Sequence, residues 1–374
     1  MVKISTVSSI EEIKAFCNVN LNDNSPFIDY DFYKQLENSK CTTAETGWVP
    51  EHIVIKNQKD LIGVIPNFKK FNSNGEYVFD HVFINAYNQL GIKYFPKYLS
   101  ATPFTPVKRE NFIYCSKKID SAILSKLIIE LLIKKKIPSF HINFIEKNIS
   151  NELKKYNFFQ RLGIQYYWYN KAYKTFECFL LSLKRKKRKN IVKEREFFKT
   201  QNINFIVKES SDINLEDIDL FYECYSNTIK KKWSIHYLNF EFFKELFESK
   251  YKTKMILIQA FDKSGFLGCS LHFRGKNTLY GRYWGALKKI PFLHFELCYY
   301  QAIEFAIRNK IHKVEAGAQG EHKIARGYLP ELTYSNHWFN CPDLIDAISS
   351  YLLDERKKII ETVNFLKSYS PFKN

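Results

Sequence analysis

The hydrophobic pattern of the chain falls into two series of predicted elements that follow the same order. In the first series, two apolar runs flank a Lys-Asp pair, as in a β-hairpin. A strand, a strongly amphipathic helix, a second strand, a short helix and a last strand follow. The predicted ranges are helices at 9–18 and 29–38, the hairpin at 52–56 and 61–68, a strand at 77–84, a helix at 121–136, a strand at 140–145, a helix at 150–157 and a strand at 164–170.

The second series repeats this order. Its predicted ranges are a hairpin at 255–260 and 266–273, a strand at 278–284, a helix at 292–310, a strand at 313–316, a short helix at 321–327 and a strand at 334–340. Single residues also align, since Gly63 matches Gly268 and Trp168 matches Trp338. An internal repeat of this length predicts a duplicated domain.

We therefore expect two α/β domains, each a mixed, mostly antiparallel sheet flanked by helices. The first would cover residues 1–175, with a Pro-rich insertion at 86–119 that has no counterpart in the second series. The second would cover residues 176–374 and contain a basic helix at 180–199 and a C-terminal helix at 343–368.

Composition narrows the class of protein. Hydrophobic residues make up 45% and aromatic residues 17% of 374 residues, which excludes disorder and allows two cores. The eight cysteines are scattered without a C-x-x-C pair, as in a reducing compartment. Glu11 and Glu12 interrupt the place of a signal peptide's apolar core, and the most apolar run, 122–133, is too short to span a bilayer. These features predict a soluble cytoplasmic protein.

The net charge of +18 is typical of proteins that bind nucleic acids or anionic membranes. Only ten of the 57 basic residues are Arg, however, whereas nucleic-acid readers favour Arg for bidentate contacts. The charge is concentrated in six consecutive basic residues, 184–189, within a helical pattern. Such a block repels itself unless counter-charge is bound, so either a solvated helix or a clamp for a phosphate-bearing substrate is predicted.

Polar chemistry gathers between residues 272 and 340. Five of the nine histidines lie between 272 and 337. Glycines flank a cluster of Glu, Gln, His, Lys and Arg residues at 315–327, and the matching segment of the first series has neither these glycines nor a histidine beside them. Polar, glycine-rich excess in one copy alone is better explained by chemistry than by folding.

The residues resemble a known family at this point. The order of elements is similar to the GNAT acyltransferase fold, and the tandem pair resembles the Fem peptidoglycan aminoacyltransferases. The whole chain resembles the bacterial FemAB-like predicted N-acyltransferases. The segments that carry this resemblance are 46–50, 75–80, 94–97, 103–106, 184–196, Gly281-Arg-Tyr-Trp-Gly285, His294-Phe-Glu296 and Glu315-Ala-Gly-Ala-Gln-Gly-Glu-His-Lys323. The pyrophosphate loop of most GNAT proteins is absent in both halves, which weakens the case for coenzyme A and fits the aminoacyl-tRNA donors of Fem proteins.

The resemblance implies N-acyl transfer, which needs a base for the amine, a held carbonyl and donors for the oxyanion. Glu315 or His322 would be the general base. The predicted substrate-binding residues are Arg282, Tyr283, Trp284, His294, Glu296, Gln319, Lys323 and Arg326. The predicted donor-phosphate contacts are Lys184, Arg185, Arg188, Lys288 and Lys289.

Structural alternatives remain for these residues. Glu315 could pair with a lysine across the sheet, His322 could be a polar residue at a helix start, and Trp284 could belong to the core. The spacing of His294 and Glu296 matches no zinc signature, so no metal is expected. No Ser or Cys lies in a nucleophile elbow.

Two functions follow. The first is an enzyme that moves an acyl or aminoacyl group from acyl-CoA or aminoacyl-tRNA to an amine, with no tightly bound cofactor. The acceptor would be a small molecule or a cell-envelope precursor, and tRNA and the membrane surface are the expected partners. The second is a non-catalytic module that binds a peptidoglycan-like or anionic ligand. The sequence leaves the donor, the acceptor and the oligomeric state open.

Overall fold

A computed structural model describes residues 2–21, 23–231, 235–318 and 320–373, and divides them into two compact units. Unit 1 comprises residues 1–164 and 332–362, and unit 2 comprises residues 165–331 and 363–374. The expected boundary near residue 175 lies close to the first crossing of the chain. The structure adds two further crossings, which return part of the second half of the sequence to unit 1 and the C-terminal residues to unit 2.

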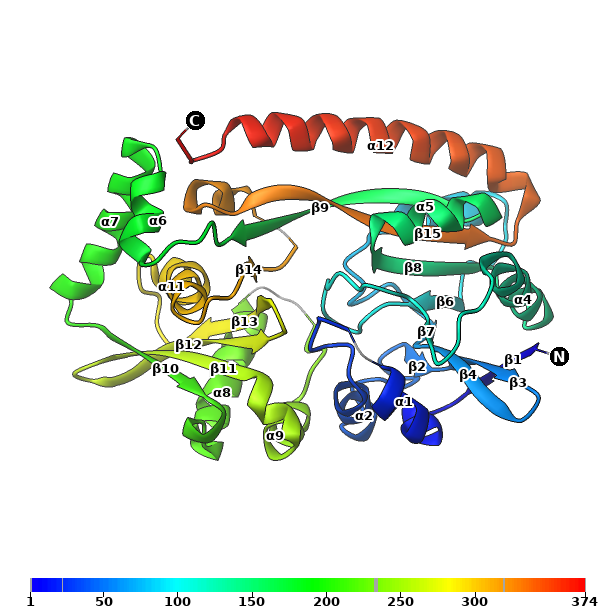
Figure 1. Ribbon diagram of the computed structural model, residues 1–374, viewed down its shortest axis with the longest axis horizontal. Coiled ribbons are helices and arrows are strands. Elements are labelled where there is room, and N and C mark those ends of the chain that lie inside the picture. The colour runs from blue at the N-terminus through cyan, green and yellow to red at the C-terminus, as the bar shows by residue number, and fades with distance from the viewer. Residues whose placement is uncertain (1, 22, 232–234, 319, 374) are drawn as a thin grey trace. The chain divides into compact units, whose positions relative to one another are not determined.

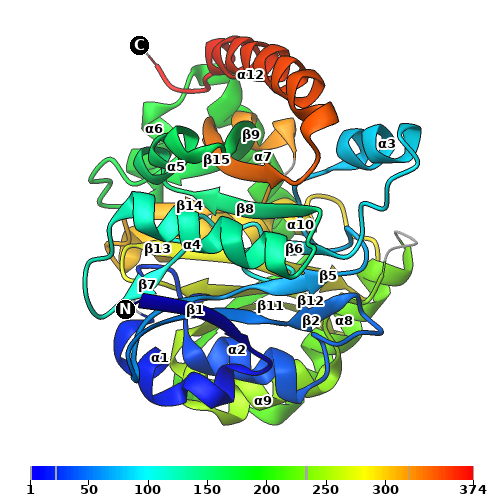
Figure 2. The ribbon, with the colours of Figure 1, turned by 90° about the vertical axis from the view of Figure 1, so that its right-hand side faces the viewer.

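Unit 1 contains the hairpin predicted at 52–68 and the long helix predicted at 121–136 (Figure 2). Its elements are β1 (Val2–Val7), η1 (Ile10–Ile13), α1 (Lys14–Asn20), α2 (Tyr30–Asn38), β2 (Trp48–Pro50), β3 (His52–Asn57), β4 (Asp60–Ile65), β5 (Phe68–Lys70), α3 (His81–Gln89), β6 (Lys97–Ser100), β7 (Tyr114–Cys115), α4 (Ser121–Lys134), β8 (Ser139–Ile145), α5 (Lys147–Leu153), η2 (Lys154–Tyr156), the first part of β9 (Phe159–Tyr169), most of β15 (Leu329–Phe339), η7 (Pro342–Leu344) and most of α12 (Ile345–Ser368).

Unit 2 contains the second hairpin and the segment rich in polar residues (Figure 1). Its remaining elements are α6 (Phe176–Ser182), α7 (Arg185–Thr200), β10 (Asn204–Glu209), η3 (Ser210–Asp212), α8 (Leu215–Lys231), α9 (Phe240–Glu248), η4 (Lys250–Lys254), β11 (Met255–Asp262), β12 (Gly265–Arg274), β13 (Thr278–Ala286), α10 (Leu293–Phe295), a π-helical turn (Glu296–Tyr300), α11 (Gln301–Arg308), β14 (Lys313–Glu315) and η6 (Glu321–Arg326).

The two units share one strand pattern. In unit 2 the strands lie in the order β10-β11-β12-β13-β14-β9, and only β13 and β14 are parallel. In unit 1, β6 and β8 form the equivalent parallel pair, and β15 lies antiparallel to β8. The hairpin β3–β4 belongs to a second sheet, β1-β3-β4-β7. Pro66 separates β4 from β5, whereas β12 is continuous, because proline supplies no N–H to a ladder.

The last strand of each unit comes from the other half of the repeat. Trp168 of β9 lies opposite Val314 of β14, and Trp338 of β15 lies opposite Phe140 of β8. The two tryptophans therefore occupy equivalent places, as the repeat predicts, but each pairs with a strand of the opposite copy. A strand needs only a matching edge and an apolar face, and both copies retain these.

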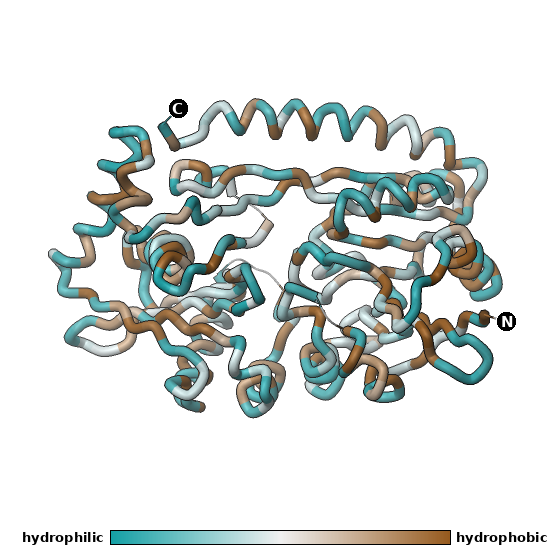
Figure 3. Tube along the Cα trace, in the orientation of Figure 1, coloured by the Kyte–Doolittle hydropathy of each residue, from teal (hydrophilic) through white to brown (hydrophobic). Residues whose placement is uncertain are grey.

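The strand predicted at 77–84 is wrong. Residues 81–89 form the helix α3, whose Phe83 and Tyr87 are buried at i, i+4 spacing on one face, while Tyr77 and Phe79 are exposed. The helix predicted at 180–199 is divided between α6 and α7, because Leu183 is extended and fully buried. The C-terminal helix is present as η7 and α12, and the alternating colours along α12 in Figure 3 reflect apolar residues such as Ile348 and Leu352 that pack on unit 1.

Candidate functional site

The polar cluster of unit 2 begins at the end of β14. Glu315 lies opposite Tyr280 of β13 on one side and Tyr167 of β9 on the other. Its carboxylate forms an ion pair with Arg282, and the two side chains are only 1% and 2% exposed. The Arg282 guanidinium lies 5.1 Å from the centre of the Tyr280 ring, and its Nη1 donates to Gly281 O at 3.0 Å. The partner of Glu315 is therefore an arginine rather than a lysine, and the carboxylate lies in the sheet interior.

His322 lies at the solvent-facing start of η6. Its Nε2 is hydrogen bonded to Tyr299 Oη at 2.9 Å. Its ring centre lies 5.8 Å from that of Phe295 and 6.1 Å from that of His294. Partial burial, followed by the charges of Arg326 and Lys323, lowers the pKa of His322 below its usual value. The imidazole is therefore neutral at pH 7, with a lone pair that can accept a proton.

Gly320 allows His322 to lie where it does. Its φ of +113° is in a region that favours glycine, and a Cβ at this position would lie 2.5 Å from His322 Cε1. The imidazole thus packs directly against the backbone of residue 320. This close approach explains the glycine next to the histidine, which the sequence showed only as a spacing.

Lys323 and Arg326 are largely buried. Lys323 Nζ donates to Gly317 O at 3.0 Å, and burial lowers the pKa of Lys323 to about 8. Arg326 forms an ion pair with Glu194 of α7 at 2.8 Å and donates to His322 O at 2.9 Å. Its guanidinium lies 3.4 Å from the centre of the Phe295 ring. Arg326 therefore fixes η6 to α7 and to the long helix.

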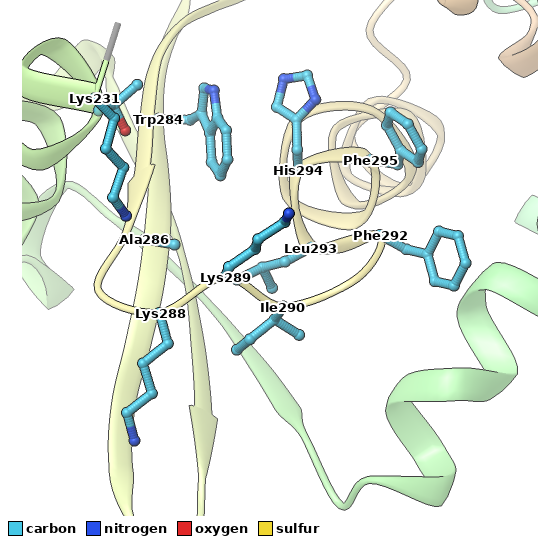
Figure 4. A pocket seen from close by; sticks show the side chains of 11 residues that line it. Lys231, Trp284, Ala286, Lys288, Lys289, Ile290, Phe292, Leu293, His294 and Phe295 are labelled. Carbon is cyan, nitrogen blue, oxygen red and sulfur yellow. The ribbon is translucent and has the colours of Figure 1, made fainter.

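A cavity of about 320 Å³ lies between α8, the end of β13 and the loop that enters the long helix. Figure 4 shows Trp284 and His294 at one end of this cavity and Lys288 at the other, and the Trp284 and His294 ring centres are 4.5 Å apart. Lys231 and Lys289 also line it. We call it the Trp284 cavity. Its size suits a small-molecule group, and its lysines suit an anionic portion of that group.

The Trp284 cavity and His322 are connected by side chains. His294 and Phe295 line the cavity, and both rings contact His322. The ring of His294 also lies 5.2 Å from that of Tyr299. The helix carrying these residues has a π turn at Glu296–Tyr300, a feature frequent at functional sites. Sequence reasoning missed Tyr299 and Lys231, because nothing in the local pattern marks either residue.

Other predicted site residues lie elsewhere. Glu296 is 1% exposed and pairs with Arg195 at 3.0 Å, so it joins the long helix to α7. The ring of Tyr283 packs against those of Tyr225 and Phe243. Gln319 lies outside the described residues.

The predicted phosphate contacts do not lie together. Lys288 and Lys289 line the Trp284 cavity, whereas Lys184, Arg185 and Arg188 do not. Lys184 is the N-cap residue of α7, and its Nζ donates to Ser370 O at 3.0 Å. Among the described residues, no carboxylate lies within ion-pair distance of residues 184–189. Their role in donor binding stays a prediction.

Two general features complete the site. Within the described ranges, no group of His, Cys, Asp and Glu side chains is arranged to hold a metal ion. In the same ranges, no helix is both long enough and apolar enough to cross a membrane.

Comparisons with known proteins support one family. The family model FemAB_like, described as peptidoglycan biosynthesis/recognition, matches residues 8–374. No curated protein sequence matches the chain significantly.

Among solved structures, the chain is similar to L-PGS from Bacillus licheniformis, with a TM-score of 0.53, 10% identity, and coverage of 92% of this chain and 97% of that one. It is similar to FemX, with a TM-score of 0.52, 10% identity, and coverage of 93% and 100%. It is also similar to the C-terminal domain of a putative lysylphosphatidylglycerol synthetase from Agrobacterium fabrum, with a TM-score of 0.53, 8% identity, and coverage of 92% and 97%. With the strand order of each unit, these matches confirm the predicted fold of two tandem GNAT-like copies.

Proposed function

The chain belongs to the FemAB-like family of peptidoglycan biosynthesis/recognition proteins, and from this premise we propose that it transfers an acyl or aminoacyl group to an amine. The acceptor would be an amine of a peptidoglycan-related precursor. The observation that carries the proposal is a neutral, solvent-facing His322 in ring contact with two residues that line the Trp284 cavity.

In this proposal the activated donor binds in the Trp284 cavity. Lys231, Lys288 and Lys289 would face its phosphate groups, whether these belong to coenzyme A or to the end of a tRNA. The acyl carbonyl would lie toward His294 and His322. Trp284 would then be a wall of the donor site.

His322 would be the general base. When its Nε2–H donates to Tyr299 Oη, the lone pair on Nδ1 can take a proton from the attacking amine. The amine nitrogen then forms the amide bond to the carbonyl carbon, and the bond from that carbon to the donor's leaving atom breaks. Because the pKa of His322 is lowered, the base is ready at pH 7, and the rate should fall only below this lowered pKa.

Glu315 is better explained as a structural residue than as the base. Its carboxylate is buried and paired with Arg282, and no change of side-chain rotamer in a packed interior would bring it to solvent at little cost. The ion pair would fix β13 against β14 and so hold the strand ends that precede the glycine loop. Lys323, with a pKa near 8, would be a nearby donor for the oxyanion or a substrate carboxylate.

The test is a transfer assay with two donors, acetyl-CoA and aminoacyl-tRNA, and a nucleotide-linked peptidoglycan precursor as acceptor. His322→Ala should lower turnover roughly 10²- to 10⁴-fold, the usual range for loss of a general base. His81→Ala is the matched control, since His81 is also exposed and stacked on an aromatic ring, that of Phe79.

Several results would contradict the proposal. Full activity of His322→Ala would remove the base. Equal losses in both histidine variants would show a general effect. Saturable precursor binding without transfer from either donor would instead support the non-catalytic binding function. Lys288→Gln with Lys289→Gln should raise the donor KM while kcat changes little, which separates donor binding from chemistry.

A further inference from the structure

A second cavity, of about 820 Å³, lies in unit 2 and shares no lining residue with the Trp284 cavity. Its walls are the loop at 170–176, the end of α11 and the residues that lead into β14. The Trp284 cavity is at the start of the helical segment 293–308 and the second cavity at its end. At about 1.5 Å per residue, the two ends are roughly 20 Å apart. A small ligand therefore occupies one cavity or the other.

The wall of the second cavity is strongly basic. Lys174, Arg308 and Lys310 line it together with His312, and all four are exposed. In the part of the chain that the structure describes, no carboxylate lies within ion-pair distance of any of them. The one acidic residue in the lining, Glu304, is already paired with Arg195 at 2.8 Å. Three permanent positive charges thus face the same open space.

A structural explanation accounts for only part of this charge. Basic residues near a helix C-terminus offset the macrodipole, which amounts to about half a negative charge. Arg308 in the last turn of α11 is sufficient for that purpose. Lys310 follows the helix, and Lys174 comes from a separate loop, so both are additional.

The loop that carries Lys174 is held in place. Asn170 N–H donates to His312 O at 2.8 Å, and Tyr173 N–H donates to Asn170 Oδ1 at 2.9 Å. Tyr173 Oη and Ser182 Oγ lie 3.0 Å apart and share a hydrogen bond. The loop is therefore tied to the residues before β14, and the cavity wall is organised before any ligand binds.

We propose that this second cavity is a binding site for a small anion that carries two or more phosphate groups. Three separated cations match a multiply charged anion better than a single carboxylate. A guanidinium fork such as that of Arg308 suits phosphate oxygens in pairs. The volume also accommodates a nucleoside attached to the phosphates.

Isothermal titration calorimetry of the full chain with inorganic pyrophosphate tests the site. The double variant Arg308→Gln/Lys310→Gln should weaken binding at least about tenfold, as expected for the loss of charge-assisted hydrogen bonds. The matched control is Lys250→Gln/Lys263→Gln, which removes the same charge from exposed positions of unit 2 that line neither cavity. Its pyrophosphate affinity should stay within about twofold of the unaltered protein. Circular dichroism checks the folding of each variant, and Lys174→Gln on the opposite wall serves if the double variant fails to fold.

Equal weakening in the two double variants, or no saturable pyrophosphate binding, would overturn the proposal. A second titration with ADP identifies the source of the phosphate groups. Tighter binding of ADP than of pyrophosphate would assign a nucleotide, and equal binding would assign the phosphate groups alone. Acyl transfer should be unchanged in Arg308→Gln/Lys310→Gln, so failure of this inference is distinguishable from failure of the proposed transferase function.

Discussion

The gap beside the parallel strand pair is closed in unit 1 and leads to the glycine-rich loop in unit 2. In unit 1, Arg109 from the Pro-rich segment 86–119 fills the place where β6 and β8 diverge. Its N–H donates to Phe144 O at 2.7 Å, and its Nη2 donates to Ser100 O at 2.7 Å and to Asn143 O at 3.0 Å. Arg109 is fully buried. In unit 2, the residues after β14 instead form the loop with Gly317 and Gly320 that leads to His322.

The same register position carries different chemistry in the two units. His141 lies opposite His337 in unit 1, where Glu315 lies opposite Tyr167 in unit 2. The Nδ1 atoms of the two histidines are 2.6 Å apart, and His141 Nε2 is bonded to Tyr94 Oη at 2.9 Å. Tyr94 in turn donates to Asp80, which is paired with Lys97.

The network of unit 1 is entirely buried, and none of these groups meets solvent. In unit 2 the buried pair of Glu315 and Arg282 is followed by a histidine that does. A duplicated fold can thus use one polar cluster for stability and the other for chemistry. Solvent access, rather than the presence of polar residues, distinguishes them.

The largest expected effect is on the stability of unit 2. Glu315→Gln should lower the free energy of unfolding by roughly 3 kcal/mol, because it leaves the buried Arg282 charge without its carboxylate. Urea denaturation measures it. His141→Gln, at the matching position of unit 1, changes no charge at pH 7 and should cost only about 1 kcal/mol. A Glu315→Gln protein that keeps its stability but loses turnover would make Glu315 the base and reverse our assignment.

The next effect concerns the loop. Gly320→Ala should lower turnover about 10²-fold, because its Cβ would displace the imidazole of His322 from its place. Gly91→Ala in unit 1 is the matched control, since Gly91 also has a positive φ, of +68°, but nothing lies within 4 Å of an added Cβ. Steady-state kinetics of the two variants separates steric displacement from backbone strain. Equal turnover in both would show that the position of His322 is unimportant.

A third difference appears in acid. Burial, followed for His141 by the Lys97 charge and for His337 by the Arg161 charge, keeps the pKa of each histidine well below its usual value. The unfolded chain binds protons at these positions near pH 6.5 and the folded protein does not. Stability is therefore complete above pH 6.5 and falls as the pH drops below it, by up to about 1.4 kcal/mol per pH unit for each histidine.

Denaturation midpoints between pH 7.5 and 5.5 measure this slope. His141→Asn with His337→Asn should flatten it, whereas His81→Ala, which alters an exposed histidine, should leave it as it is. An unchanged slope in the double variant would place the acid sensitivity outside unit 1.

The smallest effect belongs to the basic block of α7. Replacing Lys184, Lys186, Lys187 and Lys189 with Gln should weaken donor binding about threefold and flatten its dependence on salt, as expected for exposed charges. Donor affinity measured at low and moderate salt tests this. Identical affinities for the variant and the unaltered protein at both salt concentrations would identify the block as a solvated surface.

Much of this architecture could be predicted from the sequence. Hydrophobic periodicity located the hairpins, the long helices and the strand at 313–316, because these elements bury one continuous face. It failed at 77–84, where Phe83 and Tyr87 fit a helix while the neighbouring Tyr77 and Phe79 imitate a strand. The sequence alone also located the polar cluster at 315–327, since glycines beside titratable residues are rare in a packing motif.

The tertiary structure decided which residues meet. The strand exchange between β9 and β15 is invisible locally, because each strand carries the same apolar pattern and either edge would accept it. Only the folded chain pairs Glu315 with Arg282, 33 residues away, and Tyr299 with His322, 23 residues away. Burial and partner choice depend on these distant contacts, and they separate a buried ion pair from an accessible base. Residue types and spacings therefore determined the chemistry at hand, and packing determined which of it reaches solvent.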